Sequence, residues 1–209
     1  MPPQSSEKAE VKMYSDFKSP YAFLAFDPGM ALGQRFYVRV RWIPFQLRIK
    51  NRSQRSVYSD YKAKYSYLDA RRWAKPRGIL IRAPQKVYDT APALIGGLFA
   101  ESRGLLLEYS RKAYELFFRR EFEADDPEAV AALLATLRLS GAEYREYLVG
   151  EGARAYAAAQ KEAAADNVFG VPLFFFEREP FWGHDRMPIL EQRLVEAGLS
   201  IAALASGHS

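Results

Sequence analysis

The order of strand and helix patterns along the chain constrains the fold more than any other feature of the sequence. Residues 11–17 (VKMYSDF) alternate apolar and polar side chains, which predicts a strand. Ser19 is then predicted to cap a helix that begins at Pro20 and ends near Gly33. Residues 36–43 are rich in β-branched and aromatic side chains, which predicts a second strand. The chain is therefore expected to open with a β-α-β unit.

About a hundred residues in the middle of the chain are predicted to be mainly helical. A helical period begins near Asp60 and ends near Gly78, and further helices are expected at 91–103, 107–121, 127–138 and 142–164. Strand patterns return only at 172–176 (PLFFF) and 181–182, and the turn-forming stretch between them predicts a hairpin. A closing helix is expected from about Asp185 to Ala197.

This order predicts an α/β fold in which a thioredoxin-like sheet carries a large inserted helical subdomain. The chain of 209 residues fits a single domain, which we place at 11–209. Its sheet part is expected to combine 11–50 with 166–198, and the helical insertion is expected to cover about 55–165. The ends, 1–10 and 199–209, are expected to be loose.

Composition removes several classes of function. The chain has no cysteine and only two histidines, His184 and His208. Disulfides, thiolate metal ligands and a protein thiol nucleophile are therefore excluded, and a metal site or a Ser-His-Asp triad is hard to build. Any sulfur chemistry would need a sulfur brought by a ligand. Residues 1–10 lack a secretory-signal profile and no apolar run reaches the ~20 residues of a membrane span, so we expect a soluble, cytoplasmic protein.

Positive charge is concentrated in one segment. Residues 35–86 hold fifteen Lys and Arg against Asp60 and Asp69, a net charge of +13, although the whole chain carries only +5. Aromatic side chains are interleaved with these cations. The segment could attract nucleic acid or a small anionic substrate, or it could be an ordinary solvated face. Nucleic acid ranks lowest because no known nucleic-acid motif accompanies the charge.

Three turns carry the candidate site residues. At Ser19 and Pro20, unpaired N–H groups at a helix start would stabilise an anion such as a thiolate. Taken alone, however, a simple helix cap is the better explanation of Ser19, because caps occur at most helix starts. A cis Val171-Pro172 bond would leave the Val171 backbone free to pair with an extended peptide ligand, whereas a trans bond would mark only a strand start.

The third turn is Gly183-His184-Asp185-Arg186. Asp185 could cap the closing helix or bind the ammonium group of a ligand. Arg186 could anchor Asp185 or a ligand carboxylate. If the two ends of the chain join in one sheet, all three turns become adjacent.

Three sequence runs together resemble a known family. They are YSDFKSPYAFLA (14–25), FGVPLFFF (169–176) and FWGHDRMPILEQRL (181–194), and the run YKAKYSYLDARRWAKPRGI (61–79) extends the likeness over nearly the whole chain. They resemble the 2-hydroxychromene-2-carboxylate isomerases and kappa-class glutathione transferases, which are similar to the disulfide oxidoreductase DsbA. The resemblance implies a DsbA-like thioredoxin fold and glutathione as cofactor.

The resemblance also implies roles for individual residues. Ser19 matches the serine that hydrogen-bonds the glutathione sulfur. Val171, before the expected cis Pro172, matches the residue whose backbone pairs with the cysteinyl part of glutathione. Asp185 matches the carboxylate that holds the γ-glutamyl end, and Lys62 matches a ligand-binding lysine. A binding asparagine of the family corresponds to Asn51, although the loop lengths between Asn51 and Lys62 differ.

Two glutathione-dependent reactions fit this resemblance. In an isomerase, the thiolate would add reversibly to a conjugated aromatic carboxylate, and the basic segment would suit such an anionic substrate. In a transferase, the thiolate would attack an electrophile and stay attached. Isomerase is preferred, and a non-catalytic thioredoxin-like module that binds a peptide or a partner is the alternative from another class. Members of the family are often dimers, so a homodimer is also expected.

Overall fold

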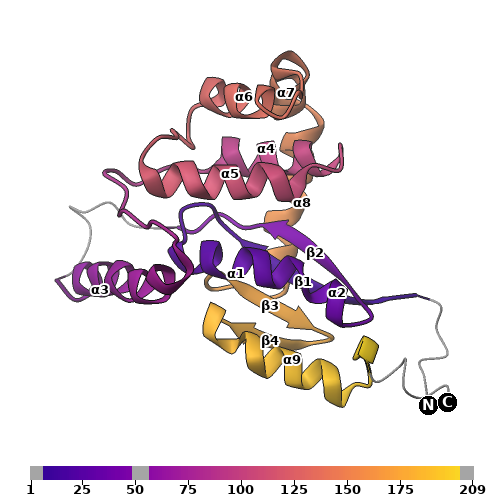
Figure 1. Ribbon diagram of the computed structural model, residues 1–209. Coiled ribbons are helices and arrows are strands. Elements are labelled where there is room, and N and C mark those ends of the chain that lie inside the picture. Colours follow the sequence, from indigo (N-terminus) through magenta and orange to yellow (C-terminus); the bar gives the residue numbers. More distant parts are fainter. Residues whose placement is uncertain (1–6, 49–56, 203–209) are drawn as a thin grey trace.

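The computed structural model contains a four-stranded mixed sheet that joins the two ends of the chain (Figure 1). The structure describes residues 7–48 and 57–202. β1 pairs in parallel with β2 and antiparallel with β3, and β4 pairs antiparallel with β3. In the order β2-β1-β3-β4, the strands are β1 (Ala9–Ser15), β2 (Val38–Pro44), β3 (Leu173–Phe176) and β4 (Glu179–Trp182). Pro180 lies in β4, an edge strand, where a missing N–H group is tolerated.

Helices lie between and around these strands. The helices of the sheet part are α1 (Pro20–Met30), α2 (Leu32–Arg35), the 3₁₀ helix η3 (His184–Arg186) and α9 (Met187–Glu196). Those between β2 and β3 are α3 (Val57–Ala74), the 3₁₀ helix η2 (Lys75–Arg77), α4 (Ala91–Glu101), α5 (Leu106–Arg119), α6 (Pro127–Ala135), α7 (Gly141–Val149) and α8 (Glu151–Ala165). In Figure 1, α4–α7 are stacked at one end of the molecule, while α3 lies beside α1. The predicted thioredoxin-like sheet with inserted helices is confirmed.

The register of the central strands brings two of the three predicted turns together. Tyr14 near the end of β1 pairs with Leu173 at the start of β3, because the two strands are antiparallel. The turn that follows β1 and the turn that precedes β3 therefore lie at the same edge of the sheet. Ser19 belongs to the first turn and Val171 to the second.

An aromatic cluster holds the turn after β1 against the helical part. Phe17 is fully buried, and its ring centroid lies 4.9 Å from that of Tyr114, 5.8 Å from Tyr109 and 6.1 Å from Trp42. These partners come from α5 and β2. Burial of one such aromatic side chain is worth about 1.5–3 kcal/mol relative to its exposure, so this contact fixes the turn firmly.

The structure corrects the expected helix at 142–164, which is two helices. α7 ends and α8 begins at Gly150, whose N–H donates to the Tyr147 carbonyl. A Cβ atom at Gly152 would lie 2.6 Å from Ile95 and 2.5 Å from Tyr147, so α8 approaches its neighbours closely. The break lets α7 and α8 each pack on α4, a tertiary requirement that the helical period does not reveal.

The expected loose ends are also corrected where they meet the sheet. β1 begins at Ala9 rather than Val11, because Ala9 and Glu10 pair with β2. At the other end, Leu199 is buried and its carbonyl accepts the Tyr37 N–H at 2.7 Å. The bounds of the helical insertion as a separate unit stay a prediction. Within residues 7–48 and 57–202, none of the helices has the length and apolar character that a membrane span requires.

Candidate active site

Ser19 lies at the N-terminus of α1 and contacts the turn before β3. Its backbone is extended, with φ −90° and ψ 116°, and its Oγ accepts the Ala22 N–H at 3.2 Å, so the predicted N-cap is found. The same hydroxyl donates to the Val171 carbonyl at 3.0 Å. Ser19 is only 3% exposed, and one buried hydroxyl therefore joins two of the three predicted turns.

Two backbone donors beside this hydroxyl have no acceptor in the described part of the chain. One is the N–H of Tyr21, the second residue of α1, and the other is the N–H of Val171. Pro20 has no N–H to offer. The N-terminus of a helix carries a partial positive charge, so an anion next to Ser19 would meet a favourable field and a free donor.

The Val171-Pro172 peptide bond is cis, which decides between the two forms that the sequence left open. The Pro172 carbonyl accepts the Gly183 N–H at 3.0 Å. This hydrogen bond brings the third predicted turn, at Gly183, next to the second, at Pro172. The three turns therefore form one continuous surface, as expected if the two ends of the chain share a sheet.

Asp185 and Arg186 lie in η3, immediately after this contact. Their side chains form an ion pair with 2.7 Å between the Arg186 Nη1 and the Asp185 Oδ2, and they are 45% and 52% exposed. An exposed ion pair contributes little to stability. It offers adjacent charges of opposite sign, which match a ligand end that carries both an ammonium and a carboxylate group.

Aromatic rings connect η3 to α1 and α3. The His184 imidazole stacks on the Tyr21 ring, with 5.2 Å between centroids and 9° between planes, and Trp73 of α3 meets it edge-on at 4.9 Å. Burial lowers the pKa of His184. The Tyr21 hydroxyl donates to Asp69 at 3.0 Å, and burial, with this carboxylate, raises the pKa of Tyr21. The described residues place no hydrogen-bond partner next to the buried His184 Nε2.

Lys62, another predicted ligand residue, is not brought into this group. Lys62 is exposed on α3, eleven residues before Trp73, or about 16 Å along the helix axis. No contact between Lys62 and the three turns is seen among the described residues. Asn51 lies outside the described residues. The roles of Lys62 and Asn51 therefore stay predictions.

Two charged residues that sequence reasoning missed are buried directly before Ser19. Asp16 is 0% exposed and Lys18 is 4% exposed, and they form an ion pair at 3.1 Å. Their local pattern gave no warning, because charged residues next to a Ser-Pro turn are usually solvated. Their other partners lie tens of residues away in the sequence.

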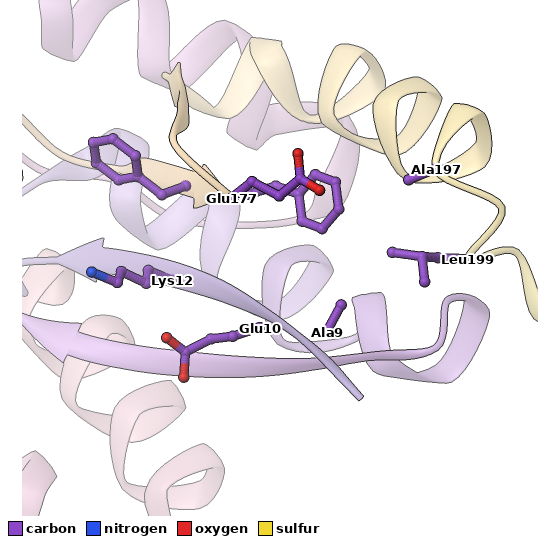
Figure 2. Close-up of a pocket in the computed structure, with 8 residues that line it drawn as sticks. Ala9, Glu10, Lys12, Glu177, Ala197 and Leu199 are labelled. Carbon is purple, nitrogen blue, oxygen red and sulfur yellow. The ribbon is translucent and has the colours of Figure 1, made fainter. Parts of the chain in front are cut away.

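A cleft of about 330 Å³ lies at the opposite end of β1 from this site (Figure 2). It is lined by residues from the start of β1, the end of β3 and the segment after α9, namely Ala9, Glu10, Lys12, Phe175, Phe176, Glu177, Ala197 and Leu199. Lys12 is already paired with Asp166 at 2.6 Å and with Glu162 at 2.9 Å. The cleft shares no residue with the three turns.

The fold and the site define the class of protein. The family model of the DSBA-like thioredoxin domain matches residues 10–195, so the chain belongs to this family of DsbA-like thioredoxin domains. Apart from Ala9 at the start of β1, the four-stranded sheet, the inserted helices and the cis proline opposite the start of α1 all lie within the matched residues.

More particular likenesses lie within this family. The chain is 28% identical over 191 residues to a 2-hydroxychromene-2-carboxylate isomerase of Pseudomonas putida, a match that covers 88% of this chain and 93% of the relative. A solved 2-hydroxychromene-2-carboxylate isomerase has the same fold, with a TM-score of 0.74 and 24% identity over 90% of this chain and 95% of that one. The cytosolic disulfide reductase DsbM of Pseudomonas aeruginosa, solved with GSH, shares the fold with a TM-score of 0.59 and 16% identity over 88% and 98% of the two chains.

Proposed function

We propose that this protein is a glutathione-dependent isomerase that acts on an anionic aromatic substrate similar to 2-hydroxychromene-2-carboxylate. The observation that carries the proposal is the buried Ser19 hydroxyl at the start of α1, in contact with the Val171 carbonyl. This hydroxyl could hydrogen-bond the sulfur of a ligand, and the chain has no cysteine thiol of its own. The relative named 2-hydroxychromene-2-carboxylate isomerase supports the choice of reaction.

The residues of the three turns fit glutathione group by group. The Val171 N–H, which lacks an acceptor in the described structure, would donate to the cysteinyl carbonyl, as in strand addition. Asp185 and Arg186 would exchange their mutual ion pair for the ammonium and the carboxylate of the γ-glutamyl end. When bound, glutathione supplies the thiol that this cysteine-free chain lacks.

Ser19 would change its donor bond when a sulfur is present. Its hydroxyl proton now points to the Val171 carbonyl, and rotation about the Cβ–Oγ bond would direct it to the sulfur instead while the oxygen keeps its place as helix cap. The Val171 carbonyl would then be free to accept an N–H of the ligand. The Ser19 hydroxyl, the Tyr21 N–H and the α1 dipole would together favour the ionised form of the sulfur.

The substrate side of the site rests on charge. Residues 60–82, which cover most of α3, η2 and the segment that follows, hold seven Lys and Arg but only two acids. Lys62, Arg72 and Lys75 are among the exposed cations. A surface of this sign would attract an aromatic carboxylate and repel a cationic substrate. A cytoplasmic location belongs to the proposal, because reduced glutathione is held there.

The proposal is tested by turnover of 2-hydroxychromene-2-carboxylate. The wild-type protein is expected to isomerise it with glutathione and not with S-methylglutathione, which keeps the shape of the ligand but has no thiol. Ser19→Ala should lower kcat by about 10²-fold, the usual loss when one donor to a developing anion is removed. Turnover that does not need glutathione would contradict the proposal.

A second assay separates the alternatives. Transfer of glutathione to an aromatic electrophile, without any isomerisation, would identify a transferase that uses the same activated sulfur. Absence of both reactions together with absence of glutathione binding would leave a non-catalytic module whose Val171 backbone pairs with a peptide.

A further inference from the structure

The ion pair of Asp16 and Lys18 belongs to a saturated network. The Asp16 Oδ2 lies 3.1 Å from the Lys18 Nζ and accepts the Leu47 N–H at 2.7 Å. Its Oδ1 accepts the Thr90 hydroxyl at 2.7 Å and the Lys18 N–H at 3.2 Å. Both carboxylate oxygens are therefore fully satisfied inside the protein.

The ammonium group of Lys18 is equally well satisfied. It donates to the Tyr88 carbonyl at 3.3 Å and to the Thr90 hydroxyl at 3.2 Å, in addition to its contact with Asp16. Three acceptors thus meet three donors. The network joins the turn after β1, the segment after β2 and the segment before α4.

Stability does not explain why these charges are buried. A buried ion pair costs desolvation energy, and replacing it by apolar residues of similar volume is often neutral or stabilising. The position of the pair offers another explanation, since the Ser19 N–H donates to the Asp16 carbonyl at 3.0 Å. Any movement of Asp16 or Lys18 is therefore transmitted to Ser19 through one turn of backbone.

We propose that Asp16 and Lys18 are positioning residues that hold the Ser19 turn in place and set, through their opposite charges, how readily a sulfur bound at Ser19 ionises. The inference rests on the proposed function, because it concerns the sulfur of bound glutathione. Lys18 favours the thiolate and Asp16 opposes it. The pair is balanced in the wild-type protein and unbalanced when either charge is removed.

Other titratable groups around the turn do not obscure this effect. Burial raises the pKa of Tyr21, Tyr114 and Tyr156, so these side chains stay neutral where a thiol titrates. Of the charged groups nearby, Arg48, Asp89, Asp185 and Arg186 are exposed and therefore screened by solvent. Asp69, which accepts the Tyr21 hydroxyl, and Arg77, which donates to the Leu24 carbonyl, are present in every variant and add the same background to each. His184 changes charge below its ordinary range, since burial lowers its pKa.

The test measures the pKa of the glutathione thiol when it is bound to the wild-type protein and to four variants. The ultraviolet absorbance of the thiolate reports its ionisation. Lys18→Met should raise the pKa of the bound thiol, Asp16→Asn should lower it, and the double variant Asp16→Asn/Lys18→Met should return it close to the wild-type value. Asp16 and Ser19 are three residues apart, so we take about 10 Å as the distance scale between one of these charges and the sulfur. One charge at that distance changes a pKa by about 0.6 to 1.2 at an effective dielectric constant of roughly 20 to 40.

Thr90→Val is the matched control, because it removes a hydroxyl from the same network without any change of charge. Its thiol pKa should stay within about 0.3 of the wild-type value, well below the effect of a full charge. Binding of S-methylglutathione, measured by calorimetry, should be similar in all variants and reports that the site is folded. A single variant with one uncompensated buried charge could fail to fold. In that case the double variant still tests the inference, because its thiol pKa is expected to be close to the wild-type value.

The outcomes are distinct. Shifts of opposite sign in the two single variants support the inference. If all variants that bind S-methylglutathione shift the thiol pKa in the same direction, or leave it unchanged, the inference is overturned while the proposed function stands. If the wild-type protein binds neither glutathione nor S-methylglutathione, the proposed function is wrong and the inference falls with it.

Discussion

Ser19→Ala should destabilise the protein by more than the loss of an ordinary helix cap. Loss of an N-cap serine costs typically about 1 kcal/mol. The substitution also removes the donor to the buried Val171 carbonyl, and a buried group left unsatisfied costs about 1–2 kcal/mol more. The free energy of unfolding should therefore fall by about 2–3 kcal/mol.

Ser140→Ala provides a matched comparison. Ser140 caps α7 by accepting the Glu143 N–H at 3.2 Å, but it is exposed and makes no second hydrogen bond within the described residues. Its replacement should cost only about 1 kcal/mol. Both variants are measured by urea unfolding at neutral pH, with the slope m unchanged. Equal losses in the two variants would refute the reasoning that the Ser19–Val171 bond ties the two turns together.

Three further results are expected. Partial burial makes protonation of His184 unfavourable in the folded state, so the stability it contributes should be complete above the ordinary pKa of 6.5 and fall as the pH drops below it. His184→Phe should flatten this dependence when unfolding is measured at several pH values. Arg41 donates a hydrogen bond to Glu162 and holds the pKa of this carboxyl group at about 2. Glu162→Gln should therefore lower the free energy of unfolding by about 1 kcal/mol above pH 4.5, a value already reduced for solvent screening, and by progressively less as the pH falls toward 2. Gly96→Ala should destabilise by about 1–3 kcal/mol in thermal unfolding despite the better helix propensity of alanine, because the new Cβ would lie 2.4 Å from the buried Tyr109 hydroxyl; an unchanged midpoint would contradict this packing.

Local signals in the sequence were sufficient for the fold and for part of the site. The strand at 11–17 and the strand at 172–176 were predicted from short alternating or apolar runs, and the structure pairs them. Ser19 before Pro20 predicted a helix cap because both residues favour that position irrespective of the rest of the protein. Strands and helix caps that depend on a few neighbouring residues can therefore be predicted from the local sequence.

Features decided by distant partners could not be predicted. The burial of Asp16 and Lys18 depends on Thr90, which is more than seventy residues away in the sequence. The break at Gly150 depends on the packing of two helices on α4. The contacts of the His184 ring with Tyr21 and Trp73 appear only when α1, α3 and η3 are assembled.

Calorimetric titration of glutathione into the wild-type protein tests the central claim most directly, with Asp185→Ala and Asp27→Ala as the two variants. Asp27 is the matched control, because it also forms an exposed ion pair at 2.7 Å, with Arg111, but does not belong to the three turns. We expect saturable binding to the wild-type protein and to Asp27→Ala, and binding weakened roughly tenfold or more in Asp185→Ala through loss of one charge-assisted contact. No binding to the wild-type protein, or equal affinity in all three proteins, would contradict the account.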